Sequence, residues 1–214
     1  MMLKFNDYKD WLRDRINGVE RAYHIPSEFN GFSGVAVDIG ANVGGCPIVN
    51  YKKFSRIICI EPSEYSYNEC IKNVREYQNV EVHKFAVSDV SNKILKLKGY
   101  KEANFSGNAS TLDSDSWDDN NFELVETISL NDIFKKFNLI KIDYLKIDCE
   151  GGEYDFLMNK NLLNIDYLGI EIHIQLREKA QELEQYLNKY FTSIHQSGDG
   201  VTMHKEITYK NKLL

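Results

Sequence analysis

Five short apolar runs alternate with amphipathic helical patterns along this chain of 214 residues, and that alternation constrains its fold more than any other feature. The runs lack a regular apolar–polar alternation, so we expect strands that are covered on both faces. A strand followed by a helix, repeated, predicts a doubly wound and mostly parallel sheet. The expected strands cover residues 34–40, 56–61, 80–87, 142–148 and 165–174.

Helical patterns and a late hairpin complete the expected architecture. Two β-like runs, 191–196 and 201–209, are joined through Ser197, Gly198, Asp199 and Gly200, which predicts an antiparallel hairpin. The fold class is therefore α/β, with a doubly wound, mostly parallel seven-stranded sheet and an antiparallel C-terminal hairpin. The helical patterns cover residues 7–23, 63–77 with Ser63 as the N-cap, 129–137, 151–163 and 177–190. We expect one domain over residues 1–214, with an N-terminal helical extension at 1–30 and the core at 31–214.

The segment 88–125 does not follow this alternation of strands and helices. It holds a short alternating run, KILKLKGY, and then the polar stretch NFSGNASTLDSDSWDDNN. A polar segment of that length is rarely left without structure unless it covers a ligand. A lid over the substrate and a solvated acidic excursion are equally good interpretations of it.

Composition limits the partners and the location. The formal net charge is −6, and the 26 Lys and Arg residues form no basic stripe, so we expect no nucleic-acid partner. The four cysteines lack a C-x-x-C spacing, as is typical of reduced thiols in a cytoplasmic protein. No signal-peptide pattern and no run long enough to span a membrane occurs. The oligomeric state leaves no signal in the sequence.

The stretch VDIGANVGG, residues 37–45, ends the first expected strand in an acid and a glycine turn. A dinucleotide-binding loop, G-x-G-x-x-G, needs its second glycine where this chain has Asn42, so a side chain stands where a diphosphate would lie. A Walker loop fails too, because no lysine followed by Ser or Thr is present in the turn. The turn therefore disfavours ligands that carry a diphosphate.

Two acids suggest which ligand the turn takes instead. Asp38 would repel a diphosphate but favour an ammonium or a sulfonium. Glu61 ends the second expected strand, at the spacing from Asp38 where an acid accepts hydrogen bonds from both ribose hydroxyls. An adenosine ligand that is cationic and has no diphosphate fits both, and S-adenosyl-L-methionine is such a ligand.

The chain at this point resembles the FkbM-type S-adenosylmethionine-dependent methyltransferases, which belong to the Rossmann-like class I. The resemblance covers residues 34 to about 174, and LKIDCEGGE is its most specific part. It implies an oxygen methyltransferase acting on a hydroxyl of a small molecule, sugar or glycan. The motifs that carry it are VDIGANVGG (37–45), CIEPSEYSYNECIKNV (59–74), AVSD (86–89), ETISLNDIF (126–134) and DYLKIDCEGGEYDFL (143–157).

The resemblance also implies the residues that hold the cofactor. The loop for the methionine part matches at Asp38, Gly40, Asn42 and Gly44. The ribose ligand matches at Glu61, which Pro62 follows, and the segment lining the adenine matches at Ser88 and Asp89. At Gly45-Cys46 the chain departs from the family, which often has a hydroxyl residue there.

The candidate reaction centre follows the fourth expected strand. Alternation places Tyr144, Lys146 and Asp148 on one side of that strand, with Asp148 at its carboxyl end. A sugar hydroxyl is a poor nucleophile and needs a base, for which Asp148 and Glu150 are the first candidates and His173 the second. Lys146 completes the candidate catalytic group, although its simplest interpretation is a partly buried ammonium paired with an acid.

Several alternatives remain open at this stage. Glu153 is better explained as a first-turn residue favoured by the helix dipole than as a catalytic one. Asp148, Glu150 and His173 are hard ligands that could gather around a metal, but no ligand spacing supports one, so we expect none. The functional alternatives are a nicotinamide-dependent oxidoreductase and a non-catalytic nucleoside-binding domain of the same fold.

Overall fold

The computed structural model describes residues 25–29, 31–100, 117–173, 177–197 and 204–214. The helix expected at 7–23, most of the N-terminal extension and the turn at 198–200 lie outside these residues. The described part opens with the short 3-10 helix η2 (Ser27–Phe29), whose Phe29 packs against Phe54.

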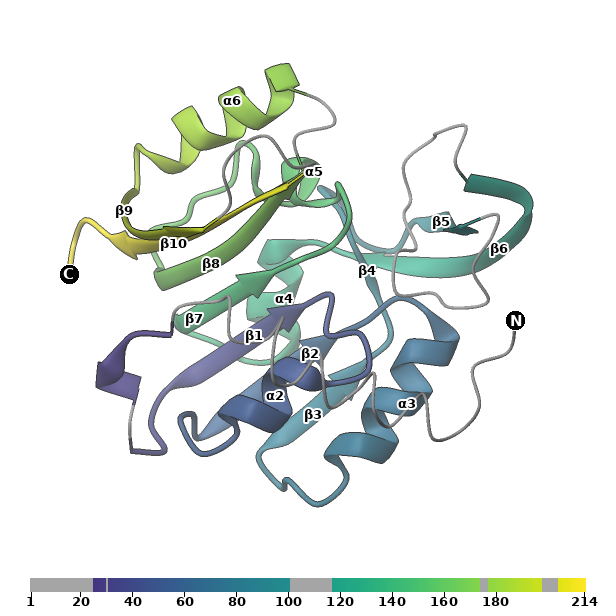
Figure 1. Cartoon of the computed structure of the whole chain (residues 1–214), viewed down its shortest axis with the longest axis horizontal. Helices are drawn as coiled ribbons and strands as arrows, with labels where there is room; N and C mark the ends of the chain where they lie inside the picture. Colours follow the sequence, from purple (N-terminus) through teal and green to yellow (C-terminus); the bar gives the residue numbers. More distant parts are fainter. Residues whose placement is uncertain (1–24, 30, 101–116, 174–176, 198–203) are drawn as a thin grey trace.

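A seven-stranded sheet forms the centre of the molecule, in the order β3-β2-β1-β7-β8-β10-β9 (Figure 1). Neighbouring strands from β3 to β8 are parallel, while β10 runs antiparallel to both β8 and β9. The expected mostly parallel sheet with an antiparallel C-terminal hairpin is confirmed. The strands are β1 (Val35–Ile39), β2 (Arg56–Ile60), β3 (Val80–His83), β7 (Ile142–Ile147), β8 (Ile165–His173), β9 (Phe191–Ser197) and β10 (His204–Asn211).

Helices cover both faces of this sheet. One buried cluster packs β1 and β7 against α4 (Leu130–Lys136), α5 (Glu153–Leu157) and α6 (Arg177–Leu187). The cluster on the other face includes side chains of α3 (Glu64–Val74). Because every central strand is buried on both faces, the apolar runs lack alternation, as their sequences indicate.

The expected strand 80–87 is wrong as a single element. The chain leaves the large sheet after β3, and β4 (Ala86–Val87) pairs instead with the end of β6 (Trp117–Ile128). Both pieces are apolar, so they form one continuous run in the sequence. A hydrophobic pattern indicates that a strand is buried but not which strand it pairs with.

Part of the segment 88–125 forms a second, three-stranded sheet. Its β5 (Ile94–Tyr100) pairs antiparallel with β6, and the order is β4-β6-β5 (Figure 1). This second sheet was not predicted. Most of the polar stretch for which a lid or a solvated excursion was considered, residues 104–121, lies outside the described residues, and its last residues belong to β6. Two helices also differ from expectation: α2 (Gly45–Asn50) was not predicted, and α5 is shorter than the pattern at 151–163.

The N-terminus of α3 is held by an unexpected residue. Ser63 occupies the N-cap position as predicted, but its side chain makes no capping hydrogen bond. Instead the backbone N–H of Glu64 donates to Glu123 Oε2 at 2.7 Å. Glu123 belongs to β6, so the small sheet is tied to the turn that follows β2.

We expect Glu123→Ala to lower the free energy of unfolding by about 0.5–2 kcal/mol, because a helix N-terminus loses its side-chain acceptor. Glu126→Ala, which removes an exposed carboxylate from the same strand, is the matched control. Urea denaturation of both variants measures the difference. Equal stabilities would show that the contact does not contribute.

Candidate active site

The glycine turn after β1 is built around a close approach of two chain segments. Gly40 has φ +73°, and a Cβ placed on it would lie 1.6 Å from the backbone oxygen of Asp148. The N–H of Asp148 donates to the Ile39 carbonyl at 3.0 Å. The turn after β1 and the turn after β7 are thus pressed together, which places Asp148 beside the glycine turn.

Glu61 links the same turn to the end of β2. Its Oε2 accepts the backbone N–H of Asn42 at 2.8 Å, and its Oε1 accepts that of Ser63 at 2.9 Å. Asn42 is left-handed, with φ 51°, and its side-chain oxygen accepts from Ser66. Glu61 is 6% exposed, and burial raises its pKa to about 7 although both N–H donors oppose the shift.

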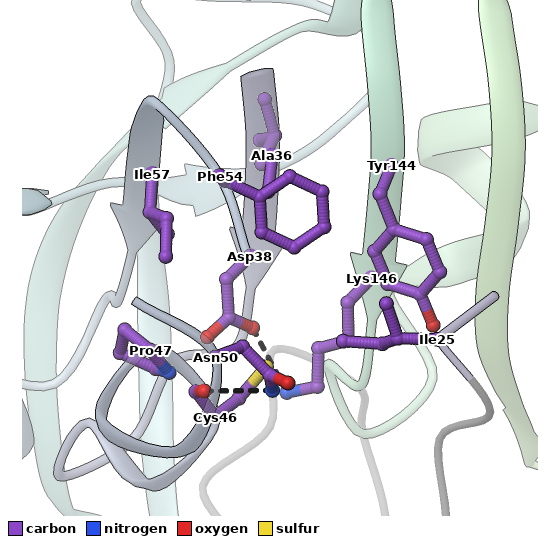
Figure 2. Close-up of a pocket in the computed structure, with 11 residues that line it drawn as sticks. Ile25, Ala36, Asp38, Cys46, Pro47, Asn50, Phe54, Ile57, Tyr144 and Lys146 are labelled. Carbon is purple, nitrogen blue, oxygen red and sulfur yellow. Dashed lines mark hydrogen bonds and ion pairs between the residues drawn. The ribbon is translucent and has the colours of Figure 1, made fainter. Parts of the chain in front are cut away.

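Asp38 and Lys146 form a buried ion pair beneath the turn. Lys146 Nζ lies 3.1 Å from Asp38 Oδ1 and donates to the Gly40 carbonyl at 3.0 Å, and both side chains are 3% exposed (Figure 2). Burial raises the pKa of Asp38, an effect that Lys146 opposes. The pairing expected for Lys146 is present, and the ammonium holds the turn in place.

A small pocket borders this ion pair. Its wall combines Asp38, Lys146 and Asn50 with apolar side chains that include Phe54 and Tyr144 (Figure 2). Asn50 Nδ2 donates to the Cys46 carbonyl at 2.9 Å, which secures α2 beside the pocket.

The remaining cofactor candidates lie at separate points of the fold. Pro62 follows Glu61 directly, and Gly44 is the left-handed N-cap of α2, where Cys70 Sγ and Val74 would each lie 3.1 Å from an added Cβ. Ser88 is buried next to β4 and donates to Asp89 Oδ1 at 3.1 Å, which lowers the pKa of the exposed Asp89.

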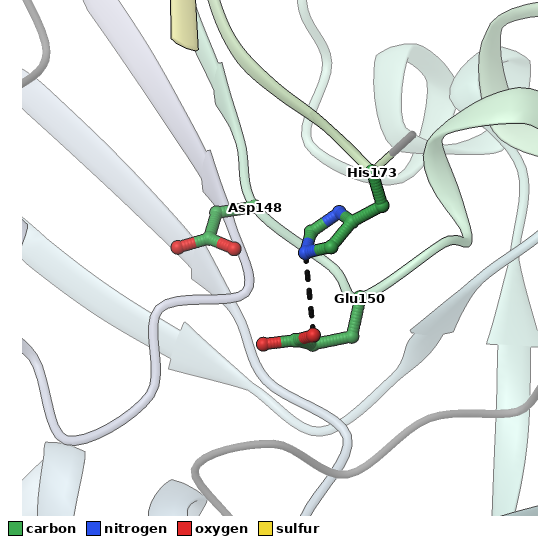
Figure 3. Close-up of side chains that lie close together, drawn as sticks. All are labelled: Asp148, Glu150 and His173. Atoms are coloured by element: carbon green, nitrogen blue, oxygen red, sulfur yellow. Dashed lines mark ion pairs between the residues drawn. The ribbon is translucent and has the colours of Figure 1, made fainter. Parts of the chain in front are cut away.

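The acids expected at the reaction centre gather with His173. Asp148, Glu150 and His173 each offer a ligand atom, and these atoms lie within 4.8 Å of one another (Figure 3). His173 Nε2 is 3.2 Å from Glu150 Oε2 and 3.5 Å from Glu171 Oε1. The three residues therefore meet at one edge of the sheet, whereas Lys146 is 3.9 Å from Asp148 and faces the Asp38 side.

Glu153 has a structural role that the sequence did not indicate. It is fully buried, and its Oε1 accepts the backbone N–H of His173 at 2.9 Å and lies 3.2 Å from His173 Nδ1. Its Oε2 accepts the N–H of Gly151 at 2.8 Å. The first-turn position at α5 is as expected, but the carboxylate orients an imidazole at the end of β8, and no local pattern encodes such a contact.

The charges around His173 shift its pKa and that of a neighbour. Burial lowers the pKa of His173, but Glu150 and Glu153 outweigh it and raise the value to about 11. The pKa of Glu171 is raised to about 8, mainly by burial and to a smaller extent by the charge of Asp148. Burial also raises the pKa of the Cys149 thiol, so this cysteine is not an activated nucleophile.

Comparison with known proteins identifies the family. The model of the methyltransferase FkbM domain matches residues 38–195, which include Glu61 and the group formed by Asp148, Glu150 and His173. The chain belongs to the FkbM methyltransferase family. S-Adenosyl-L-methionine is the cofactor of this family, and the glycine turn, with Asn42 in place of the second glycine of a dinucleotide-binding loop, agrees with it. The search of curated proteins gave no significant match.

Solved structures support the class I methyltransferase fold of this family member. The chain is similar to an FkbM methyltransferase from Methylobacillus flagellatus KT, with 18% identity and a TM-score of 0.50 over 82% of this chain and 43% of that one. M. capricolum TrmK, in complex with S-adenosyl-homocysteine, gives 14% identity and a TM-score of 0.52 over 99% of this chain and 70% of that one.

A third solved structure with a similar fold is that of an RNA-processing protein. The Methanococcus jannaschii fibrillarin pre-rRNA processing protein shares 12% identity and a TM-score of 0.55 over 88% of this chain and 70% of that one. Identities this low show a common fold and leave the acceptor open. Among the helices of the described segments, none is long and apolar enough to cross a membrane.

Proposed function

We propose that this methyltransferase moves the methyl group of S-adenosyl-L-methionine to a hydroxyl oxygen of a small molecule, sugar or glycan. The observation that carries the proposal is the contact between the two turns, which sets Asp148 against the glycine turn, with Glu150 and His173 beside it. Carboxylates at that place suit a hydroxyl acceptor, whose proton must be accepted as the methyl moves.

We assign the cofactor contacts as follows. The two oxygens of Glu61 keep lone pairs beyond those used by Asn42 and Ser63, so the carboxylate can accept the ribose hydroxyls. Asp38 is paired with Lys146, and the turn that this pair holds in place is where we assign the methionine part. The residues that hold the cofactor are Asp38, Gly40, Asn42, Gly44, Glu61, Pro62, Ser88 and Asp89.

The reaction needs an oxygen lone pair in line with the methyl carbon and its sulfur. The oxygen–carbon bond forms as the carbon–sulfur bond breaks, the bonding pair stays on sulfur, and the hydroxyl proton passes to a base. Asp148 and Glu150 are the candidate bases, with His173 beside them. Lys146 is a positioning residue, because its ammonium contacts Asp38 and Gly40 and lies farther from Asp148.

Labelled methyl transfer tests the proposal. The protein is incubated with cofactor labelled in its methyl group and a panel of sugars, glycolipids and hydroxylated small molecules. Label in an alkali-stable ether is the expected product, since a methyl ester would lose its label in base. Label confined to nitrogen, to an ester or to RNA would contradict hydroxyl transfer, and no transfer with a well-bound cofactor would favour a non-catalytic domain.

We also propose a cytoplasmic location. All four cysteines are free thiols, and three of them are buried in the core near α2 and α3. Thiols that stay reduced are typical of a reducing compartment.

The raised pKa of Glu61 predicts that cofactor affinity depends on pH. Below about pH 7 Glu61 takes up a proton, and the neutral carboxyl accepts hydrogen bonds from the ribose less well. Affinity for S-adenosyl-homocysteine should therefore rise between pH 6 and pH 8 in wild-type protein. Glu61→Gln should bind more weakly at high pH, and the difference between the two calorimetric profiles isolates this carboxylate. Parallel profiles would contradict the assignment of Glu61.

A further inference from the structure

We propose that Asp148, Glu150 and His173 bind a divalent cation at the edge of the sheet beside the cofactor turn. The inference rests on the proposed function and deepens it, because the cation would hold the acceptor oxygen. No ligand spacing in the sequence supports such a site, since its members come from the turn after β7 and from the end of β8, the next strand of the large sheet.

The distances suit a cation after a small movement. Ligand atoms at about 2.1 Å from a metal lie at most ~4.2 Å apart, with about 3 Å for neighbouring positions of an octahedron. His173 Nε2 and Glu150 Oε2 are already 3.2 Å apart. The three ligand atoms lie within 4.8 Å of one another, and a rotation of the Asp148 side chain would close the few tenths of an ångström that remain. Lys146 Nζ lies 3.9 Å from Asp148 Oδ2.

A separate residue prepares the histidine for this role. Glu153, which lies outside the group and is fully buried, contacts Nδ1 of His173 and also accepts the backbone N–H of the same residue. A carboxylate on the far nitrogen of a histidine is the usual support of a metal-bound imidazole, because it fixes the ring and leaves Nε2 to the metal. His173 is itself 7% exposed, and its Nε2 faces Glu150 at 3.2 Å and Glu171 at 3.5 Å.

The backbone of Glu150 gives further support. Glu150 has φ 52°, a left-handed conformation that a residue with a Cβ adopts at a cost of about 1–2 kcal/mol. Residues held in this way are concentrated at ligand sites. The Glu150 carboxylate points toward His173 (Figure 3).

The donor set indicates the kind of cation. Two carboxylates and one imidazole suit Mn²⁺, Mg²⁺ or Zn²⁺ and leave coordination positions open for an acceptor hydroxyl. The pKa of a hydroxyl falls when its oxygen binds a divalent cation, so its proton would pass more readily to the carboxylate oxygen of Asp148 or Glu150 that does not bind the cation.

Binding of Mn²⁺, followed by the loss of the free-ion electron paramagnetic resonance signal, tests the site without cofactor or acceptor. One Mn²⁺ per chain is expected after removal of bound metals with EDTA. Glu150→Gln and Asp148→Asn should each weaken binding at least tenfold, and Glu153→Gln about 10- to 100-fold through the orientation of His173. Glu182→Gln, which removes an exposed carboxylate of α6, should bind as wild type does.

Absence of Mn²⁺ binding, or equal binding by wild type and Glu150→Gln, would overturn the inference. Calorimetry with S-adenosyl-homocysteine on the EDTA-treated protein separates this failure from that of the proposed function. If the cofactor product binds while Mn²⁺ does not, the metal site falls and the proposed function stands. If Mn²⁺ binds at the three residues and the cofactor product does not bind in either form, the proposed function falls and the cation site stands as a separate finding.

Discussion

Asp148→Asn combined with Glu150→Gln is expected to slow methyl transfer by roughly two to four powers of ten, because these are the groups that we propose to accept the hydroxyl proton. The affinity for S-adenosyl-homocysteine should change far less, since we assign the cofactor mainly to Glu61 and the glycine turn. Single-turnover transfer of labelled methyl and calorimetry on the same preparation measure the two quantities.

Two exposed carboxylates of α6 offer a control for this double change. Glu178→Gln with Glu182→Gln alters the net charge of the protein by the same amount and should leave both quantities at wild-type values. A double variant of the active site that transfers methyl groups as fast as this control would show that neither Asp148 nor Glu150 takes part.

Gly40→Ala is expected to lower the free energy of unfolding by more than about 3 kcal/mol. The left-handed φ of +73° disfavours a Cβ by about 1–2 kcal/mol, and that Cβ would lie 1.6 Å from the Asp148 carbonyl, so backbone must also move. Where the variant stays folded, cofactor binding should be lost as well, because the turns after β1 and β7 are forced apart. Urea denaturation and calorimetry measure the two effects.

Gly152→Ala provides the matched control for Gly40→Ala. Gly152 has φ −73°, and an added Cβ would meet Cys149 Sγ at 3.3 Å, a contact that a small shift relieves. Its stability should stay within about 1 kcal/mol of wild type. If the two alanine variants were equally stable, the close approach at Gly40 would not matter.

Much of the fold was predictable because it depends on local signals. The central strands of the large sheet and helices such as α3 follow from apolar runs and from amphipathic patterns. The second sheet was not predicted, since β4 and the end of β6 pair although they are distant in the chain, and a hydrophobic pattern does not name its partner. Helix α2 was missed because a helix of six residues that includes Pro47 gives too brief a pattern.

The candidate site was also predictable only in part. Carboxyl ends of parallel strands meet at one edge, so the sequence brought Asp38, Glu61 and Asp148 to one region without any coordinates. The contacts of Glu153 with His173 and of Glu123 with α3 join residues far apart in the chain. They depend on side-chain packing in three dimensions, for which a single sequence holds no signal.

Isothermal titration calorimetry with S-adenosyl-L-methionine and with NAD, run side by side, tests the central claim most directly. We predict one site for S-adenosyl-L-methionine, weakened by Asp38→Ala and by Glu61→Gln, and no heat with NAD because Asn42 stands in place of the second glycine. Binding of NAD in preference to the sulfonium cofactor, or sulfonium binding that neither substitution changes, would contradict the account.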